Sequence, residues 1–327
     1  MITQAYTSSL LTFLIILLSL GKLRQEAWAK LVGLSDNNNN NNNTLGDENE
    51  EQEYQPKPGR PCVSDEKTVD IVLEVDLIGK DVGRSVIFRF RNNERDDWSV
   101  ATPSGQSSEE EVNKFDTVCC DRLAQVLERT ILEPMAGKWH YYQGLHDIAG
   151  VLLHNMDYNV KKSTNILRRV CQSHLRDALR ENFKSVTWLL DVLLLPLIEQ
   201  MEPHVHYALL VSEVEMSNVC LPWLITWFTH DIHDHVVAGR MLDAFVAGHP
   251  LLPFYVAVAL LTHPLLKHQI LNADANDPAS IFPILKQLPF GIVSDTAAPA
   301  EDEHEYTTTV VAQELIEDAL SIMYVLL

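Results

Sequence analysis

Two short segments of this chain contain side chains suited to chemistry on phosphate and water. The first runs from Ile78 to Arg84 and has an IxxDxxR pattern, and the second, from Tyr141 to Gly144, has a YxQG pattern. A guanidinium is always charged and offers forked donors to phosphate oxygens. A glutamine amide can both donate to and accept from a water molecule. Arg84 and Gln143 are therefore the first candidates for functional groups.

Other catalytic patterns are absent or less specific. The sequence contains no GxxxxGK[ST] loop, no GxSxG elbow and no HExxH motif, so nucleotide binding by the chain itself, acyl hydrolysis and zinc proteolysis lack their usual signatures. The segment from His230 to His235 offers imidazoles and carboxylates that could ligate zinc. Its position after an apolar helix is also typical of a polar helix end. We expect no metal ligands, with a metal-dependent hydrolase centred on this segment as an alternative.

Composition argues against nucleic-acid binding and indicates a reducing compartment such as the cytosol. The chain has 327 residues and a net charge of −20, so it lacks the basic excess with which proteins neutralise nucleic-acid phosphates, and we expect no nucleic-acid partner. Its 5 cysteines form no CxxC pair and leave one odd, a pattern typical of reduced thiols in cytosol. Cys119 and Cys120 are interpreted as half-buried helix residues.

The N-terminal segment, residues 1–21, has several interpretations. It contains no charged side chain, and Leu10 to Leu20 is almost wholly apolar. A signal peptide would have basic residues before the apolar run, and a full membrane span needs about 20 apolar residues. A membrane anchor through residues 10–20, a core helix and a misassigned start of the gene therefore stay open.

Polar low-complexity stretches interrupt the chain. The asparagine run from Asn37 to Asn43 is followed by acidic residues and prolines, so we predict a disordered insert at about 35–68 that buries too little apolar surface to offset its ordering entropy. A second insert is predicted at about 92–113. An acidic linker and a C-terminal amphipathic helix are expected within 291–327.

The remaining sequence predicts helices. Apolar residues recur at helical spacing in segments 118–131, 166–179, 186–198, 221–228, 236–246 and 251–261. Prolines separate these segments, as is typical of helix starts and ends. One segment differs, because Val69 to Val75 alternates and is rich in β-branched residues, which predicts a strand. The whole pattern predicts an all-α core.

The two polar motifs, in this order, resemble the dual-finger signature of TBC-domain Rab GTPase-activating proteins. Leu23 to Leu31 is similar to the family's opening LRxxxWxxL helix. Tyr141 to Asp147, which reads YYQGLHD, and the SEVE, WLITWF, LDAF and HPLLPFY segments within Ser212 to Pro264 are similar to the member 20 branch of the family. The resemblance covers roughly residues 22–290, interrupted by the two predicted inserts.

The resemblance implies an all-α TBC domain over 22–290 that accelerates GTP hydrolysis by a Rab-family small GTPase in its GTP-bound state. Arg84 would stabilise charge on the transferred phosphoryl group, and Gln143 would position the attacking water, both acting in trans. The supporting residues would be Asp81, Tyr141, Ile78 and Gly144. The partner would bind GTP and magnesium, so the chain would need no cofactor of its own.

The member 20 branch also implies ER-to-Golgi traffic, either on the cytoplasmic face of those membranes or in the cytosol. Two features depart from the family. The branch ends in a hydrophobic anchor, whereas Val310 to Leu327 predicts an amphipathic helix. Gly79 and Gly83 lie in the arginine segment, and each costs a helix about 1 kcal/mol relative to alanine. They leave open a non-catalytic, TBC-like scaffold that binds a Rab.

Overall fold

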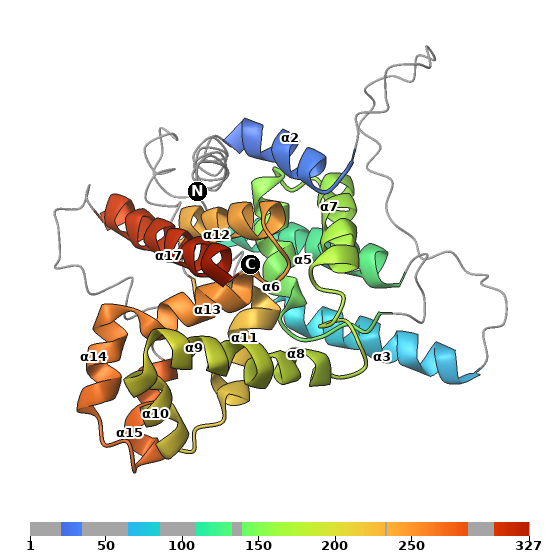
Figure 1. Cartoon of the computed structure of the whole chain (residues 1–327). Helices are drawn as coiled ribbons and strands as arrows, with labels where there is room; N and C mark the ends of the chain where they lie inside the picture. Colours follow the sequence, from blue (N-terminus) through green and yellow to red (C-terminus); the bar gives the residue numbers. More distant parts are fainter. Residues whose placement is uncertain are drawn as a thin grey trace, which may run out of the picture.

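The computed structural model describes residues 21–34, 65–85, 109–132, 139–232, 234–286 and 304–326. Within these ranges every regular element is a helix, and the helices pack into one hydrophobic cluster (Figure 1). The predicted all-α fold is therefore confirmed.

The helices succeed one another along the chain with short connections in its second half. They are α2 (Gly21–Leu31), α3 (Asp65–Val82), α5 (Glu109–Ile131), α6 (Leu145–Asn155), α7 (Val160–Ser173), α8 (Lys184–Leu189), the π-helical turn η1 (Leu190–Leu194), α9 (Leu195–Met201), α10 (Pro203–Val211), α11 (Met216–Thr226), α12 (His235–Ala247), α13 (Leu252–Thr262), α14 (Pro264–Asn272), α15 (Pro278–Lys286) and α17 (His304–Leu326).

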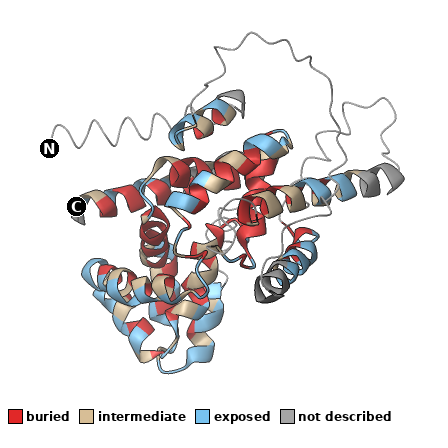
Figure 2. Ribbon diagram, turned by 90° about the vertical axis from the view of Figure 1, so that its right-hand side faces the viewer, coloured by how far each residue is buried: buried red, intermediate tan, exposed pale blue. Residues whose placement is uncertain are grey.

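Helix α13 lies at the centre of the core. All of its residues from Leu252 to Leu261 are buried, and a helix that is apolar on every side is stable only when other helices enclose it. Helix α17 packs along it, and α9, η1, α11 and α14 also contact it. Figure 2 shows the buried residues gathered along these central helices, with exposed residues on the outer faces.

The C-terminal helix α17 belongs to this core. Ile316, Ala319 and Leu320 are buried in the same cluster as the residues of α13, and α17 contacts both α12 and α13. The predicted domain end at residue 290 excludes this helix, whereas the hydrophobic core includes it. The helix begins at His304, earlier than the Val310 expected from the sequence.

The strand predicted for Val69 to Val75 is wrong, because these residues lie within helix α3. Ile78 and Val82, four residues apart, are buried and form an apolar stripe along the helix. Helix α3 packs against α5 and α6, whereas Val72, Leu73 and Val75 are exposed. The helix is therefore anchored through its C-terminal half, and the weak local preference of β-branched residues for strands is overridden.

The C-terminal ends of both predicted disordered inserts are helical. Residues 65–68 form the first turn of α3, and residues 109–113 form the first turn of α5. Both helix starts are rich in acidic residues, which favour the positive end of a helix dipole. The rest of each insert, residues 35–64 and 92–108, lies outside the described residues.

Some predicted helices have different bounds. The helix predicted for 166–179 ends with α7 at Ser173, and Leu175 and Leu179 are buried in the turns that follow. The segment 186–198 is divided among α8, η1 and α9. Pro222 lies inside α11 instead of at an end.

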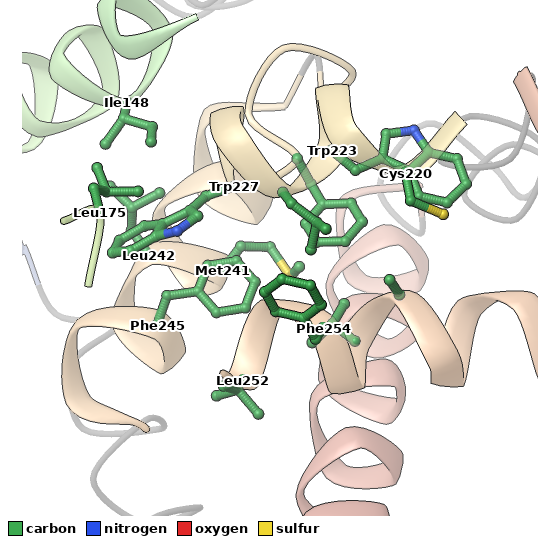
Figure 3. Close-up of a cluster of buried hydrophobic side chains, with 14 of the residues drawn as sticks. Ile148, Leu175, Cys220, Trp223, Trp227, Met241, Leu242, Phe245, Leu252 and Phe254 are labelled. Atoms are coloured by element: carbon green, nitrogen blue, oxygen red, sulfur yellow. The ribbon is translucent and has the colours of Figure 1, made fainter. Parts of the chain in front are cut away.

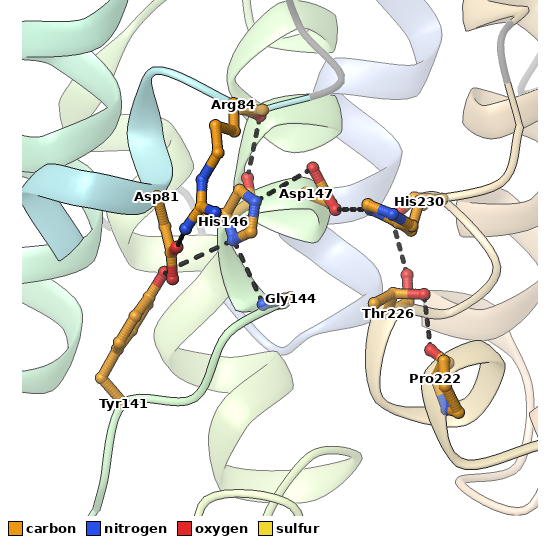
Figure 4. A network of polar contacts seen from close by, with 11 residues as sticks. Asp81, Arg84, Tyr141, Gly144, His146, Asp147, Pro222, Thr226 and His230 are labelled. Carbon is orange, nitrogen blue, oxygen red and sulfur yellow. Dashed lines mark hydrogen bonds and ion pairs between the residues drawn. The ribbon is translucent and has the colours of Figure 1, made fainter. Parts of the chain in front are cut away.

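A cluster of aromatic side chains determines how the chain leaves α11 (Figure 3). Trp227 and Phe228 both have left-handed backbone conformations, with φ of 51° and 62°, which cost a side chain-bearing residue on the order of 1–2 kcal/mol. Both side chains are buried, and their rings lie 5.4 and 6.2 Å from that of Phe245. Burial of two large aromatic rings offsets the strain, and the turn brings His230 towards α6 (Figure 4).

A buried ion pair attaches α2 to α12. The Arg24 guanidinium donates from Nε and Nη2 to the two carboxylate oxygens of Asp243, at 2.9 and 2.8 Å, and the indole of Trp28 donates to the same carboxylate at 2.8 Å. Burial raises the pKa of Asp243 to about 6, although Arg24 and Trp28 oppose this shift. The carboxylate is therefore stable in the core only with these donors present.

Among the described residues no single helix has the length and hydropathy of a membrane span, and α10 and α11 meet that criterion only as a pair bent by 117°. Residues 10–20, the candidate anchor in the sequence, lie outside the described ranges.

We expect Arg24→Ala to lower the free energy of unfolding by about 3–5 kcal/mol, because it leaves the buried Asp243 carboxylate without its hydrogen-bonded cation. The loss should be smaller at pH 5 than at pH 8. Without Arg24 the pKa of Asp243 in the folded state rises further above its unfolded value of about 3.9. At pH 5 the folded protein can therefore protonate this carboxyl and avoid a buried charge, whereas at pH 8 it cannot. Urea denaturation at both pH values measures this.

Glu26→Ala serves as the matched control, because Glu26 lies on the same helix and is exposed. Its effect should stay within about 0.5 kcal/mol. Equal losses in the two variants would show that the ion pair does not attach α2.

Candidate functional site

Arg84 lies in the turn directly after α3. The turn is closed by its backbone N–H, which donates to the Asp81 carbonyl at 2.9 Å. Its guanidinium donates from Nη2 to Oδ1 of Asp81, the pairing that the three-residue spacing predicts. The Arg84 side chain is 62% exposed, whereas that of Asp81 is 4% exposed. A buried carboxylate thus orients the guanidinium of an arginine whose side chain is largely exposed.

Tyr141 connects this turn to the YxQG segment. Its phenol donates to Oδ2 of Asp81 at 3.0 Å, and its backbone N–H donates to Oε1 of Glu74 on α3 at 3.4 Å. Burial, reinforced by the Asp81 carboxylate, raises the pKa of Tyr141 far above its usual range, so the phenol keeps the proton that it donates. Ile78 of α3 is fully buried and packs the helix against the core.

Gln143 is exposed between two buried residues, Tyr142 and Gly144. The Tyr142 phenol donates to the Ile225 carbonyl at 2.8 Å, which secures one side of the turn. Gly144 has a φ of +119°, and a Cβ atom built there would lie 2.8 Å from the Thr226 methyl carbon. Both the backbone conformation and the available space therefore require glycine after Gln143.

His146 contacts both segments (Figure 4). Its Nδ1 accepts the Gly144 N–H at 3.1 Å and lies 3.4 Å from the Tyr141 phenol oxygen. Its backbone carbonyl accepts from the Ser85 hydroxyl, one residue after Arg84, at 3.3 Å. Burial lowers the pKa of His146, partly opposed by the nearby carboxylates, which favours the neutral imidazole that these contacts need.

Asp147 extends the network to the segment after α11. Its carboxylate is fully buried, with Oδ2 2.7 Å from Nδ1 of His230 and Oδ1 3.4 Å from Nε2 of His146. Its backbone N–H also donates to the Gly144 carbonyl at 3.1 Å. The first turn of α6 is thus braced by side chains from a distant part of the chain.

The structure therefore connects most of the residues that the sequence singled out. Arg84, Asp81, Tyr141 and Gly144 belong to one network, Ile78 is buried below it, and Gln143 is exposed in the same turn as Gly144.

Three further members of the network, His146, Asp147 and His230, were not expected from the sequence. The polar pair His146 and Asp147, one residue after the Gln-Gly dipeptide and at the start of an apolar helix, was the available signal.

The histidine-rich segment before α12 has other roles. Asp234 caps α12 by accepting from the N–H groups of Val236 and Val237 at 2.7 and 3.1 Å, and His230 pairs with Asp147. His233 lies outside the described residues, and among those described no group of three or more His, Cys, Asp or Glu is arranged to hold a metal ion.

The adjacent cysteines of α5 were predicted to be half-buried helix residues. Cys119 is buried and Cys120 is half-buried. Burial, followed by the charge of Asp121, raises the pKa of the Cys120 thiol, and a raised pKa disfavours the nucleophilic thiolate.

We expect Gly144→Ala to destabilise the protein by about 2–4 kcal/mol, since it adds backbone strain and a clash with Thr226. Gly144→Ala with Thr226→Ser should recover part of the loss, because serine lacks the clashing methyl but keeps a hydroxyl that can donate to the Pro222 carbonyl. Thermal and urea unfolding measure both variants.

Gly79→Ala is the control for this prediction. A Cβ atom at Gly79 meets nothing within 4 Å, and the residue lies inside α3, so the substitution should stabilise by about 0.5–1 kcal/mol. A Gly144→Ala variant as stable as the unmodified protein would contradict the required glycine conformation.

Comparison with known proteins gives a family match and several relatives for this chain. Residues 124–271 match the family described as the Rab-GTPase-TBC domain. TBC1 domain family member 20 of Homo sapiens is 32% identical over 157 residues, which cover 48% of this chain and 37% of the human protein. GTPase-activating protein gyp10 of Schizosaccharomyces pombe is 31% identical over 121 residues, covering 37% of this chain and 31% of the yeast protein.

The matched region therefore spans less than two fifths of each of these relatives. A solved RabGAP TBC domain from the Chlamydomonas flagellum aligns over 77% of this chain and 71% of its own, with a TM-score of 0.44 and 13% identity, a likeness too loose to inform the site. By its motifs, its family match and its relatives, this chain resembles the TBC-domain Rab GTPase-activating proteins, and among them TBC1 domain family member 20, with a matched domain that contains Gln143 and begins after Arg84.

Proposed function

We propose that this chain is a GTPase-activating protein for a Rab-family small GTPase, to which it supplies Arg84 and Gln143 in trans. The observation that carries the proposal is an exposed arginine whose guanidinium is held by a buried carboxylate, in the same polar network as the turn that bears an exposed glutamine. The match to the Rab-GTPase-TBC domain and the likeness to gyp10 support it.

Arg84 would stabilise the transition state of GTP hydrolysis. Charge is spread over the oxygens of the transferred phosphoryl group, and a guanidinium inserted from a second protein can neutralise it. Asp81 uses one edge of the guanidinium, and Arg84 has further N–H donors for phosphate oxygens. Holding the side chain before the partner arrives lowers the entropy lost on binding.

Gln143 would position the attacking water. Its amide oxygen can accept a hydrogen bond from water and its amide nitrogen can donate one to a phosphate oxygen or to the partner's backbone. The buried flanks of the turn, Tyr142 and Gly144, limit backbone motion, which matters because in-line attack requires a defined water position.

The remaining parts of the proposal follow from these roles. Asp81 and Tyr141 are positioning residues for Arg84, Ile78 packs α3, and Gly144 allows the turn. The partner is the GTP-bound form of the GTPase, which itself binds GTP and magnesium, so the chain supplies no cofactor.

We propose a role in membrane traffic between ER and Golgi, on the cytoplasmic face of those membranes or in the cytosol. The likeness to the member 20 protein, which is the basis for this assignment, covers 37% of that protein's length.

We expect Arg84→Ala to reduce the stimulated rate of single-turnover GTP hydrolysis by about 10³–10⁵-fold, and Gln143→Ala by about 10²-fold or more. Arg84→Lys should restore little, since an ammonium lacks the planar fork of a guanidinium. A screen of GTP-loaded Rab proteins with a phosphate-release readout identifies the substrate and measures these rates.

Arg180→Ala is the matched control. Arg180 forms an ion pair with Asp177 at the same three-residue spacing, and its side chain is 58% exposed, so its loss should leave the stimulated rate unchanged. Full activity of both Arg84→Ala and Gln143→Ala would contradict the proposal. Binding of a GTP-loaded Rab without any acceleration would instead favour the non-catalytic scaffold.

A further inference from the structure

One imidazole nitrogen holds the backbone of the turn that bears Gln143. Nδ1 of His146 accepts the N–H of Gly144, the residue after Gln143, at 3.1 Å. An imidazole nitrogen accepts a hydrogen bond only when it carries no proton. His146 must therefore be neutral with its proton on Nε2.

The surroundings of His146 select this tautomer. Its Nε2 lies 3.4 Å from Oδ1 of the buried Asp147 carboxylate, whose Oδ2 is 2.7 Å from Nδ1 of His230. The Tyr141 phenol, 3.4 Å from Nδ1, already gives its proton to Asp81. The contacts of Nδ1 and of Nε2 thus both favour the same ring orientation and the same neutral tautomer.

The same residue lies against the arginine segment. The carbonyl of His146 accepts from the hydroxyl of Ser85, which directly follows Arg84. Arg84 and Gln143 belong to segments that are far apart in the sequence, and His146 contacts Ser85 next to the first and Gly144 next to the second; Figure 4 shows His146 between Arg84 and Gly144. Reaction rates depend steeply on such relative positions, since a displacement of about 1 Å can cost about 10²-fold.

We propose that His146 is a positioning residue that holds the Gln143 turn in its active geometry beside Arg84. This inference rests on the proposed function, because it assigns His146 to the same site. Protonation of Nδ1 would place two donors, the imidazolium N–H and the Gly144 N–H, against each other and release the turn.

The groups that face His146 determine its response to pH. They are Asp81 and Arg84 at the end of α3, Tyr141 in the loop before α6, Asp147 on α6 and His230 after α11. Burial lowers the pKa of His146, the two carboxylates oppose this, and His230 and Arg84 reinforce it. As the pH falls below about 6.5, His146 is therefore protonated in the unfolded state before it is protonated in the folded state. The free energy of unfolding that the neutral ring contributes then declines.

Three substitutions of His146 separate positioning from packing. His146→Asn places an amide oxygen at the same bond distance from Cβ as Nδ1. His146→Gln extends its amide to the position of Nε2, and His146→Leu removes all hydrogen bonding. Only the asparagine side chain can accept the Gly144 N–H at the position of Nδ1. The asparagine variant should therefore keep the hydrogen bond that the other two variants lose.

The first measurement is hydrogen exchange of the Gly144 amide in the full chain without a partner. The exchange should accelerate about 10-fold in the leucine and glutamine variants, which corresponds to the loss of one hydrogen bond, and stay near the original rate in the asparagine variant. Unchanged exchange in the leucine variant would overturn the proposal whether or not any GTPase is stimulated.

The second measurement is stimulated single-turnover GTP hydrolysis between pH 5 and 8. The leucine and glutamine variants should lower the maximal rate about 10- to 100-fold with little change in the half-saturating concentration. The asparagine variant should retain most of the rate, and its rate should not decline at acidic pH.

Full activity in the leucine variant would overturn the positioning role. Equal losses of rate in all three variants, with equally lowered free energies of unfolding, would also overturn it. Absence of stimulation by the unmodified chain would refute the proposed function instead, and the exchange rates would still decide the role of His146 in the turn.

Discussion

The buried carboxylate of Asp81 is the group on which the arrangement of the site depends. It accepts from the Arg84 guanidinium through one oxygen and from the Tyr141 phenol through the other. A buried charge is stable only when its hydrogen-bonding capacity is met, so both donors are held firmly. One donor comes from the end of α3 and the other from the loop before α6, and the carboxylate thereby joins two segments that the sequence separates widely.

The glutamine side of the site depends on backbone conformation more than on charge. Gly144 has a positive φ and lies close to Thr226, and its N–H is bound by His146. The strained turn at Trp227 and Phe228 brings His230 to Asp147, which in turn faces His146. The strain is compensated in the aromatic core of α11 and α12, so packing far from the surface contributes to the position of an exposed side chain.

Helices from both ends of the described chain complete the core that supports this network. Helix α17 covers α12 and α13, and α2 is attached to α12 through Arg24 and Asp243. The exposed arginine and glutamine thus project from a closely packed helical body. A rigid support of this kind reduces the conformational entropy that a site loses when it binds a partner.

The sequence alone predicted the all-α fold and the pairing of Arg84 with Asp81, because helical periodicity and short spacings act within a few residues. It singled out Arg84 and Gln143 as candidates only through two motifs and a family resemblance. It mispredicted Val69 to Val75 as a strand and left α17 outside the domain, since the packing of Ile78 and Val82 that holds α3 on the core, and the burial of α17, are tertiary. The contacts of Asp81 with Tyr141 and of Asp147 with His230 join residues distant in the chain. Local sequence patterns contain no information on such contacts, so the folded structure alone decided them.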